Sequence, residues 1–177
     1  MAFDLGNLLQ QYLGGQQQGA NTAQPEDDFD RVAQAAPRSA VAQGVTQALR
    51  SDQTPPFPQM VSQMFGQSDP NQRAGMLNQL LGSLGPGLLS SVAGGALGNL
   101  FGGGGGNQAQ PQVTPEQAAR MTPEQVQDIA EKAEQQNPSI VDRMGDFYAE
   151  NPTLVKAIGG AALAIALGHI AQGMRRN

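Results

Sequence analysis

Side chains that can act as bases, nucleophiles or metal ligands are scarce in this chain of 177 residues. There is no cysteine, the one histidine is His169, and the lysines are Lys132 and Lys156. The absence of cysteine excludes disulfides, thiol nucleophiles and thiolate metal sites. General-base and Schiff-base chemistry also have few residues to use. We therefore expect the protein not to be an enzyme, and we expect no cofactor.

Carboxylates offer the competing interpretation, a hydrolase or transferase that uses Asp28, Asp142 or Asp146 as acid and base. No pair of them has a recognisable catalytic spacing, and Asp142 and Asp146, four residues apart, indicate one solvated helix face. The acidic group at 26–30 lacks the twelve-residue loop of an EF-hand. We interpret it as the first turn of a helix, where carboxylates complement the helix dipole, and we predict no metal site.

Phosphate and nucleic-acid binding also lack the residues that they need. The glycine run 102–106 is not followed by the Lys-Ser or Lys-Thr pair of a phosphate-binding loop, so we interpret it as part of a linker. The net charge is −5, and lysine and arginine form no cluster. Because non-specific affinity for nucleic acid comes from such clusters, we expect no nucleic-acid partner.

Apolar residues recur at helical spacing, and no stretch alternates as a half-buried strand would. The expected helices cover residues 4–13, 26–36, 39–50, 57–65, 70–84 and 88–101 in the first part of the chain. Thr114-Pro-Glu-Gln and Thr122-Pro-Glu-Gln repeat one helix-start signal, a threonine N-cap with proline at the first helical position and glutamine at the third. Further helices follow Asn137-Pro and Asn151-Pro. The sequence therefore predicts an all-α fold.

Glycine- and glutamine-rich stretches divide the chain into expected parts. Residues 1–25 would hold a short helix and a flexible linker at 14–24, and residues 26–101 a bundle of short helices. A second linker at 102–112 would lead to a carboxy-terminal helical unit over 113–177. Such stretches bury too little apolar surface to offset the entropy of ordering them. Proteases should therefore cut first at 14–24 and 102–112.

The strongest apolar spacing in the first half predicts a contact surface for a protein partner. Its residues are leucine, methionine, valine and phenylalanine on two neighbouring helices: Phe57, Met60, Val61, Met64, Phe65, Leu77, Leu80 and Leu81. Methionine-rich faces occur both in ordinary cores and in adaptable peptide grooves. We expect the protein to be a helical interaction or assembly module that uses this face.

The expected last helix, 153–174, is apolar on two opposite sides and has a row of small residues between them. Gly160, Ala164 and Gly168 are spaced by four, a pattern that lets two helices approach closely. A helix that is apolar all round is buried in protein or in lipid. Self-association is the favoured interpretation, because Lys156 and His169 shorten the apolar run below the usual span of about 20 residues. The alternative is membrane anchoring through residues 153–177.

Three segments resemble known proteins: the Gln-Met-Val-Ser-Gln-Met-Phe run at 59–65, the segment 71–82, and the segment 137–148. They are similar to small Gly- and Gln-rich bacterial proteins of unknown function, with a weaker likeness to the YidB-like group. The resemblance implies a bacterial source and a mostly helical fold. It transfers no catalytic or binding residue. We expect a cytoplasmic location, either free or at the inner membrane.

Overall fold

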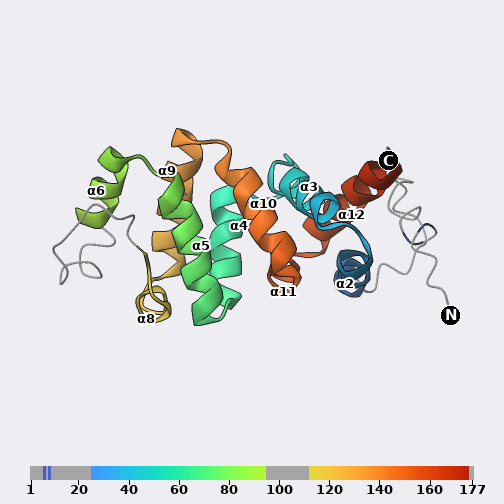
Figure 1. Ribbon diagram of the computed structural model, residues 1–177, viewed down its shortest axis with the longest axis horizontal. Helices are drawn as coiled ribbons and strands as arrows, with labels where there is room; N and C mark the ends of the chain where they lie inside the picture. Colours follow the sequence, from blue (N-terminus) through green and yellow to red (C-terminus); the bar gives the residue numbers. More distant parts are fainter. Residues whose placement is uncertain (1–5, 7, 9–24, 95–111, 176–177) are drawn as a thin grey trace. The chain divides into compact units, whose positions relative to one another are not determined.

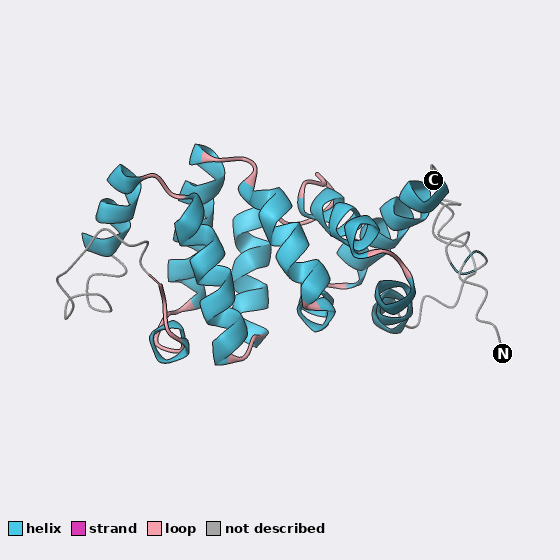
Figure 2. Cartoon of the chain, viewed as in Figure 1, coloured by secondary structure: helices cyan, strands magenta, loops and turns pink. Residues whose placement is uncertain are grey.

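The computed structural model describes residues 6, 8, 25–94 and 112–175, and every regular element in these ranges is a helix (Figures 1 and 2). The all-α prediction is confirmed. Apart from Gly6 and Leu8, the expected first helix at 4–13 lies outside the described residues. So do the linker at 14–24 and all of the second linker except Gln112.

The helix starts predicted from the two threonine caps are confirmed, and the helix expected from residue 70 begins after an aspartate cap, Asp69. Helices α5 (Pro70–Ser83), α8 (Pro115–Ala118) and α9 (Pro123–Gln136) each begin with proline and carry a complete capping box. In α9, the Thr122 hydroxyl accepts from the Gln125 amide at 3.4 Å, and the Gln125 side chain accepts from the Thr122 amide at 3.1 Å. These reciprocal bonds satisfy backbone amides that have no partner inside the helix.

The described helices belong to two compact units with different boundaries from the expected parts. Unit 1 combines Met1–Pro56 with Met144–Asn177, whereas unit 2 is the continuous segment Phe57–Arg143. The expected division placed 26–101 in one part and 113–177 in another. It failed to anticipate two long-range pairings, α3 with α12 in unit 1 and α4 with α9 in unit 2. The chain order of the helices therefore does not match their grouping in space.

Unit 1 contains α2 (Pro25–Ala35), α3 (Arg38–Leu49), the last part of α10 (Ile140–Glu150), α11 (Pro152–Val155), a 3₁₀ turn η1 (Lys156–Ile158) and α12 (Gly160–Arg175). Helix α12 packs on α3 and also contacts α2. Aromatic and branched apolar side chains fill the core. Its buried members include Phe29, Val45, Tyr148, Leu163, Leu167 and Ile170.

Two buried glycines let helices of unit 1 approach each other closely. A Cβ on Gly44 of α3 would collide with the Ile170 side chain and would lie 2.7 Å from the backbone oxygen of Ala166. A Cβ on Gly145 of α10 would collide with Thr46 of α3. Real Cβ atoms do not come as close to backbone as 2.7 Å, so any larger residue at Gly44 would force the two helices apart, whereas one at Gly145 would first have to displace the Thr46 side chain.

Unit 2 contains α4 (Phe57–Gln67), α5, α6 (Pro86–Gly94), α8 and α9, followed by the start of α10. Helix α9 packs on both α4 and α5, and α8 packs on α5. The Arg73 guanidinium holds the end of α4 to α5, because it donates to the Phe65 oxygen at 2.9 Å and to the Gly66 oxygen at 3.0 Å. It also lies 5.0 Å from the Phe65 ring centroid, within cation–π range.

Two side chains join segments of unit 2 that are distant in sequence. The Asn78 carboxamide accepts from the Val113 amide at 2.7 Å and donates to the Val113 oxygen at 3.3 Å. The Gln136 side chain accepts from the Gly85 amide at 3.2 Å. These bonds fix the start of α6 beside the end of α9 and fix Val113 beside α5.

The expected single helix at 153–174 is wrong, because the chain breaks within it. Residues 152–158 form α11 and η1, and Gly159 then takes a φ of 92° before α12 begins. This left-handed conformation is open to glycine and costly for other residues. Leu154 consequently lies in α11, Ile158 in η1 and Ile165 in α12, so the three residues do not share one helix face.

Candidate functional site

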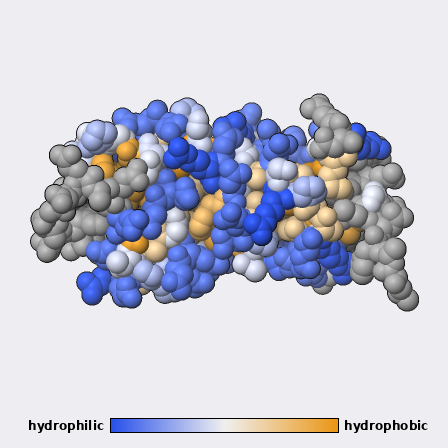
Figure 3. Space-filling view, viewed as in Figure 1, coloured by the Kyte–Doolittle hydropathy of each residue, from blue (hydrophilic) through white to orange (hydrophobic). Residues whose placement is uncertain are grey.

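The eight residues expected to form a partner surface are instead the core of unit 2. None of them is more than 3% exposed, and six have no exposed surface at all. They lie in α4 and α5, which pack against α9 and α8. The outer surface in the region of α5 is mostly hydrophilic in Figure 3. Core filling therefore explains the apolar spacing of Phe57, Met60, Val61, Met64, Phe65, Leu77, Leu80 and Leu81.

The structure places the small-residue row on the opposite side of α12 from α3. The buried side of α12 consists of Ala162, Leu163, Ala166, Leu167, Ile170 and Ala171. By contrast, Gly160 is exposed, and Ala164 and Gly168 are half-buried. We call this second side the outward face of α12; it comprises Gly160, Ala161, Ala164, Ile165, Gly168 and Gln172. It carries no charged side chain.

The close helix approach that the small row predicted occurs on the other side of α12. There Ala166 lies against Gly44, so the crossing uses one small residue from each helix. The sequence contained a signal for it, since Gly44 interrupts the apolar series Val41, Val45 and Ala48 in the middle of α3. A glycine within a helix costs about 1 kcal/mol relative to alanine, which indicates a packing reason for it.

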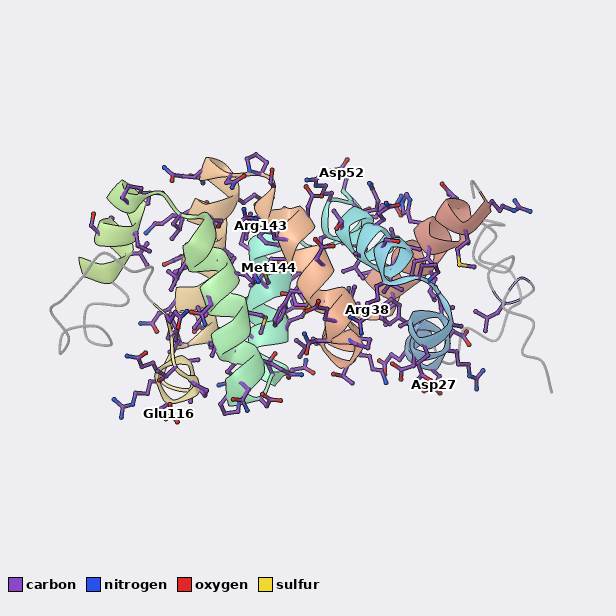
Figure 4. The ribbon with its side chains drawn as sticks, in the orientation of Figure 1. Asp27, Arg38, Asp52, Glu116, Arg143 and Met144 are labelled. Atoms are coloured by element: carbon purple, nitrogen blue, oxygen red, sulfur yellow. The ribbon has the colours of Figure 1, made fainter. Side chains whose placement is uncertain are left out.

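The acidic group of α2 takes part in ion pairs within unit 1. The Asp30 carboxylate pairs with the Lys156 ammonium of η1, and both side chains are about one-third exposed, at 31% and 30%. Asp28 pairs with Arg31 at 3.8 Å. Asp27 lies exposed at the edge of α2, as Figure 4 shows. The hydrogen bond from Lys156 to Asp30, with the nearby charges of Asp30, Asp27 and Glu26, raises the pKa of Lys156.

Three further side chains have pKa values that are shifted by their surroundings in the fold. Burial raises the pKa of the Tyr148 phenol, which has no exposed surface. Glu116 and Glu124 stand at the starts of α8 and α9, and each carboxylate accepts hydrogen bonds from its own amide and from the capping threonine. These bonds lower the pKa of both glutamates, and Figure 4 shows Glu116 at the edge of α8.

The carboxylates weighed as catalytic groups are placed on helix surfaces. Asp142 and Asp146 are exposed on α10, and Asp28 is half-buried on α2. Across residues 25–94 and 112–175, no three histidine, aspartate or glutamate side chains gather into a group that could hold a metal ion. His169 is half-buried on α12, beside Gly168 of the outward face.

None of the helices that the structure describes combines the length and the apolar character that a membrane-spanning helix needs. Helix α12 has 16 residues, because Gly159 and η1 separate it from Pro152–Val155.

The chain was compared with protein-family models, with curated proteins and with solved structures. None of the three comparisons gives a significant match.

Proposed function

We propose that the protein is a non-catalytic assembly module that associates with a second copy of itself through the outward face of α12. The observation that supports this proposal is the uncharged, small-residue character of that face. In α12 the only charged side chain is Arg175, at the last position. A helix on a protein surface normally turns charged or polar residues to the solvent.

The residue sizes on this face suit a helix as the partner. Gly160, Ala164 and Gly168 present almost no side chain, so a second helix can approach the backbone of α12 closely. Ile165 lies beside the row and is half-buried, which leaves part of an apolar side chain for a partner to cover. Two copies of the same face would meet about a twofold axis, the commonest symmetry of homodimers.

The proposal is tested by the mass of the full chain in sedimentation equilibrium over a wide concentration range. We expect a dimer that dissociates on dilution, and we expect Gly168→Leu to shift dissociation to higher concentration by blocking close approach. Gly82→Leu is the matched control, because Gly82 is exposed on α5 and a Cβ there meets no atom within 4 Å. Gly160 is less suitable, since a Cβ there would lie 3.2 Å from Pro25.

Three other results would change the proposal. A monomer at all concentrations would overturn the self-association proposal. An unchanged dimer in Gly168→Leu would remove the outward face from the interface. Recovery in a membrane pellet after a high-salt wash, lost in Ile165→Glu, would favour surface anchoring over self-association. A point variant is preferable to deleting 153–177, because that deletion removes buried residues of unit 1 such as Leu163 and Leu167.

A further inference from the structure

The described part of α2 begins beside the outward face of α12. Pro25 is the first residue of α2, and its side chain lies 3.2 Å from the position that a Cβ on Gly160 would occupy. Gly160 is the first residue of α12 and the first member of the small-residue row. The chain that precedes Pro25 therefore joins unit 1 at one end of this face.

The preceding segment has the length to reach every part of the face. Residues 14–24 can span up to about 36 Å when fully extended, at roughly 3.3 Å per residue. Helix α12, with 16 residues, is about 24 Å long at 1.5 Å per residue. Attachment at Pro25 also keeps the segment near the face, at an effective concentration on the order of millimolar for a short linker.

The chemistry of residues 5–13 complements that of the face. Their large apolar side chains, Leu5, Leu8, Leu9, Tyr12 and Leu13, repeat at helical spacing, and none of residues 5–13 is charged. Leu8 is helical and half-buried. Large side chains on one helix fit the space over small residues on another.

From the position of Pro25, the apolar stripe of residues 5–13 and the uncharged outward face, we infer that this segment docks on the outward face of α12 in its own chain. It thereby competes with the second copy, so the segment regulates assembly. This regulatory role rests on the proposed self-association, whereas the docking does not. A second copy replaces the segment when the protein concentration, weighted by the affinity of the second copy for the face, exceeds the effective concentration of the segment, weighted by the affinity of the segment.

Thiol labelling tests the docking, because the chain has no cysteine of its own. Ala164→Cys places a single thiol on the outward face, and its rate of reaction with a maleimide is measured in the full chain over a dilution series. Leu8→Glu puts a charge on the apolar stripe, and Gln10→Glu puts the same charge off it. Gln63→Cys, exposed on α4, reports the reactivity of an uncovered thiol.

We expect slow labelling of Ala164→Cys that does not change on dilution. Leu8→Glu should accelerate it about tenfold or more, since burying one leucine contributes at least the energy of a tenfold change. Gln10→Glu should leave the rate unchanged. Equal rates with and without Leu8→Glu at every dilution would overturn the docking.

The dilution series separates this inference from the proposed function. Protection that appears only at high concentration and survives Leu8→Glu would support self-association and overturn the docking. Protection that needs high concentration but is lost in Leu8→Glu would place the segment on a second copy and overturn same-chain docking. A third outcome is that Leu8→Glu abolishes the protection of the thiol, while the labelling rate is independent of concentration both with and without Leu8→Glu. It would support the docking and overturn self-association.

Discussion

Gly44 shows how one residue determines the packing of unit 1. We expect Gly44→Ala to lower the free energy of unfolding by about 1–3 kcal/mol, the usual cost of overpacking, because the new methyl group would meet Ile170 and Ala166. Gly82→Ala is the matched control. It should leave stability unchanged or raise it by up to about 1 kcal/mol, since alanine favours helix and the site is open. Urea unfolding followed by circular dichroism measures both, and equal stabilities would contradict the close crossing.

The ion pair between Lys156 and Asp30 should make stability depend on alkaline pH. Lys156 has a raised pKa in the folded protein, so the pair stabilises the fold at pH values below the ordinary lysine pKa of 10.5. This contribution is lost as the pH rises through the folded pKa. Because both side chains are about one-third exposed, we expect a small effect that salt reduces. Melting temperatures between pH 9 and 12 should fall less in Lys156→Met than in the unchanged chain.

At the scale of the helix, the capping boxes are the clearest local determinants of structure. Thr122→Ala removes the hydroxyl that accepts from the Gln125 amide at the start of α9. We expect a loss of about 1 kcal/mol in the free energy of unfolding. Thr122→Ser keeps a hydroxyl and should retain most of that stability. Denaturant titration distinguishes the two variants, and similar losses in both would show that the cap is not the cause.

Acid should weaken the same helix starts. The pKa of Glu124 is lowered in the folded protein from its ordinary value of 4.5. Its hydrogen bonds therefore stabilise the fold at pH values above 4.5, and this contribution is lost as the pH falls through the folded pKa. Glu124→Gln should make the unfolding midpoint of the protein less dependent on pH between 5 and 3. A pH dependence that Glu124→Gln leaves unchanged would assign the acid sensitivity to other carboxylates.

Local signals in the sequence predicted most helix starts, but they did not predict which helices pair. Proline with a capping residue fixes a start within a few residues, so the beginnings of α5, α8 and α9 could be found without the structure. The break at Gly159 was missed because small and apolar residues continue across it. The role of Gly44 was missed because it depends on Ala166 and Ile170, which are more than a hundred residues away.

For the molecule as a whole, the grouping of segments predicts how fragments behave. Unit 1 is built from two separate pieces, residues 1–56 and 144–177, whereas unit 2 is continuous. We expect each piece of unit 1 to be mostly unfolded alone, because α3 and α12 bury their apolar faces against each other. An equimolar mixture should be more helical than the sum of the separate pieces. Circular dichroism measures this, and full helicity of either piece alone would contradict the pairing.

The candidate surface could be predicted only in part at this scale. The row at Gly160, Ala164 and Gly168 was found from its spacing, but spacing alone cannot show which side of a helix its own chain covers. The apolar stripe at Phe57–Phe65 was assigned to a partner, although α9 supplies the surface that buries it. Both assignments depend on contacts between segments that are far apart in sequence, and these follow from the whole fold.

The discontinuity of unit 1 also sets an order of events while the ribosome makes the protein. Helices α2 and α3 leave the exit tunnel early, yet α12 follows only after all of residues 57–143 have been synthesised. Because synthesis proceeds at about 5–20 residues per second, the apolar face of α3 stays uncovered for several seconds before α12 is made. Unit 2 can fold completely in that interval. The nascent chain thus exposes Val41, Val45 and Leu49 throughout this interval, and we expect a chaperone that binds apolar helices to bind them there.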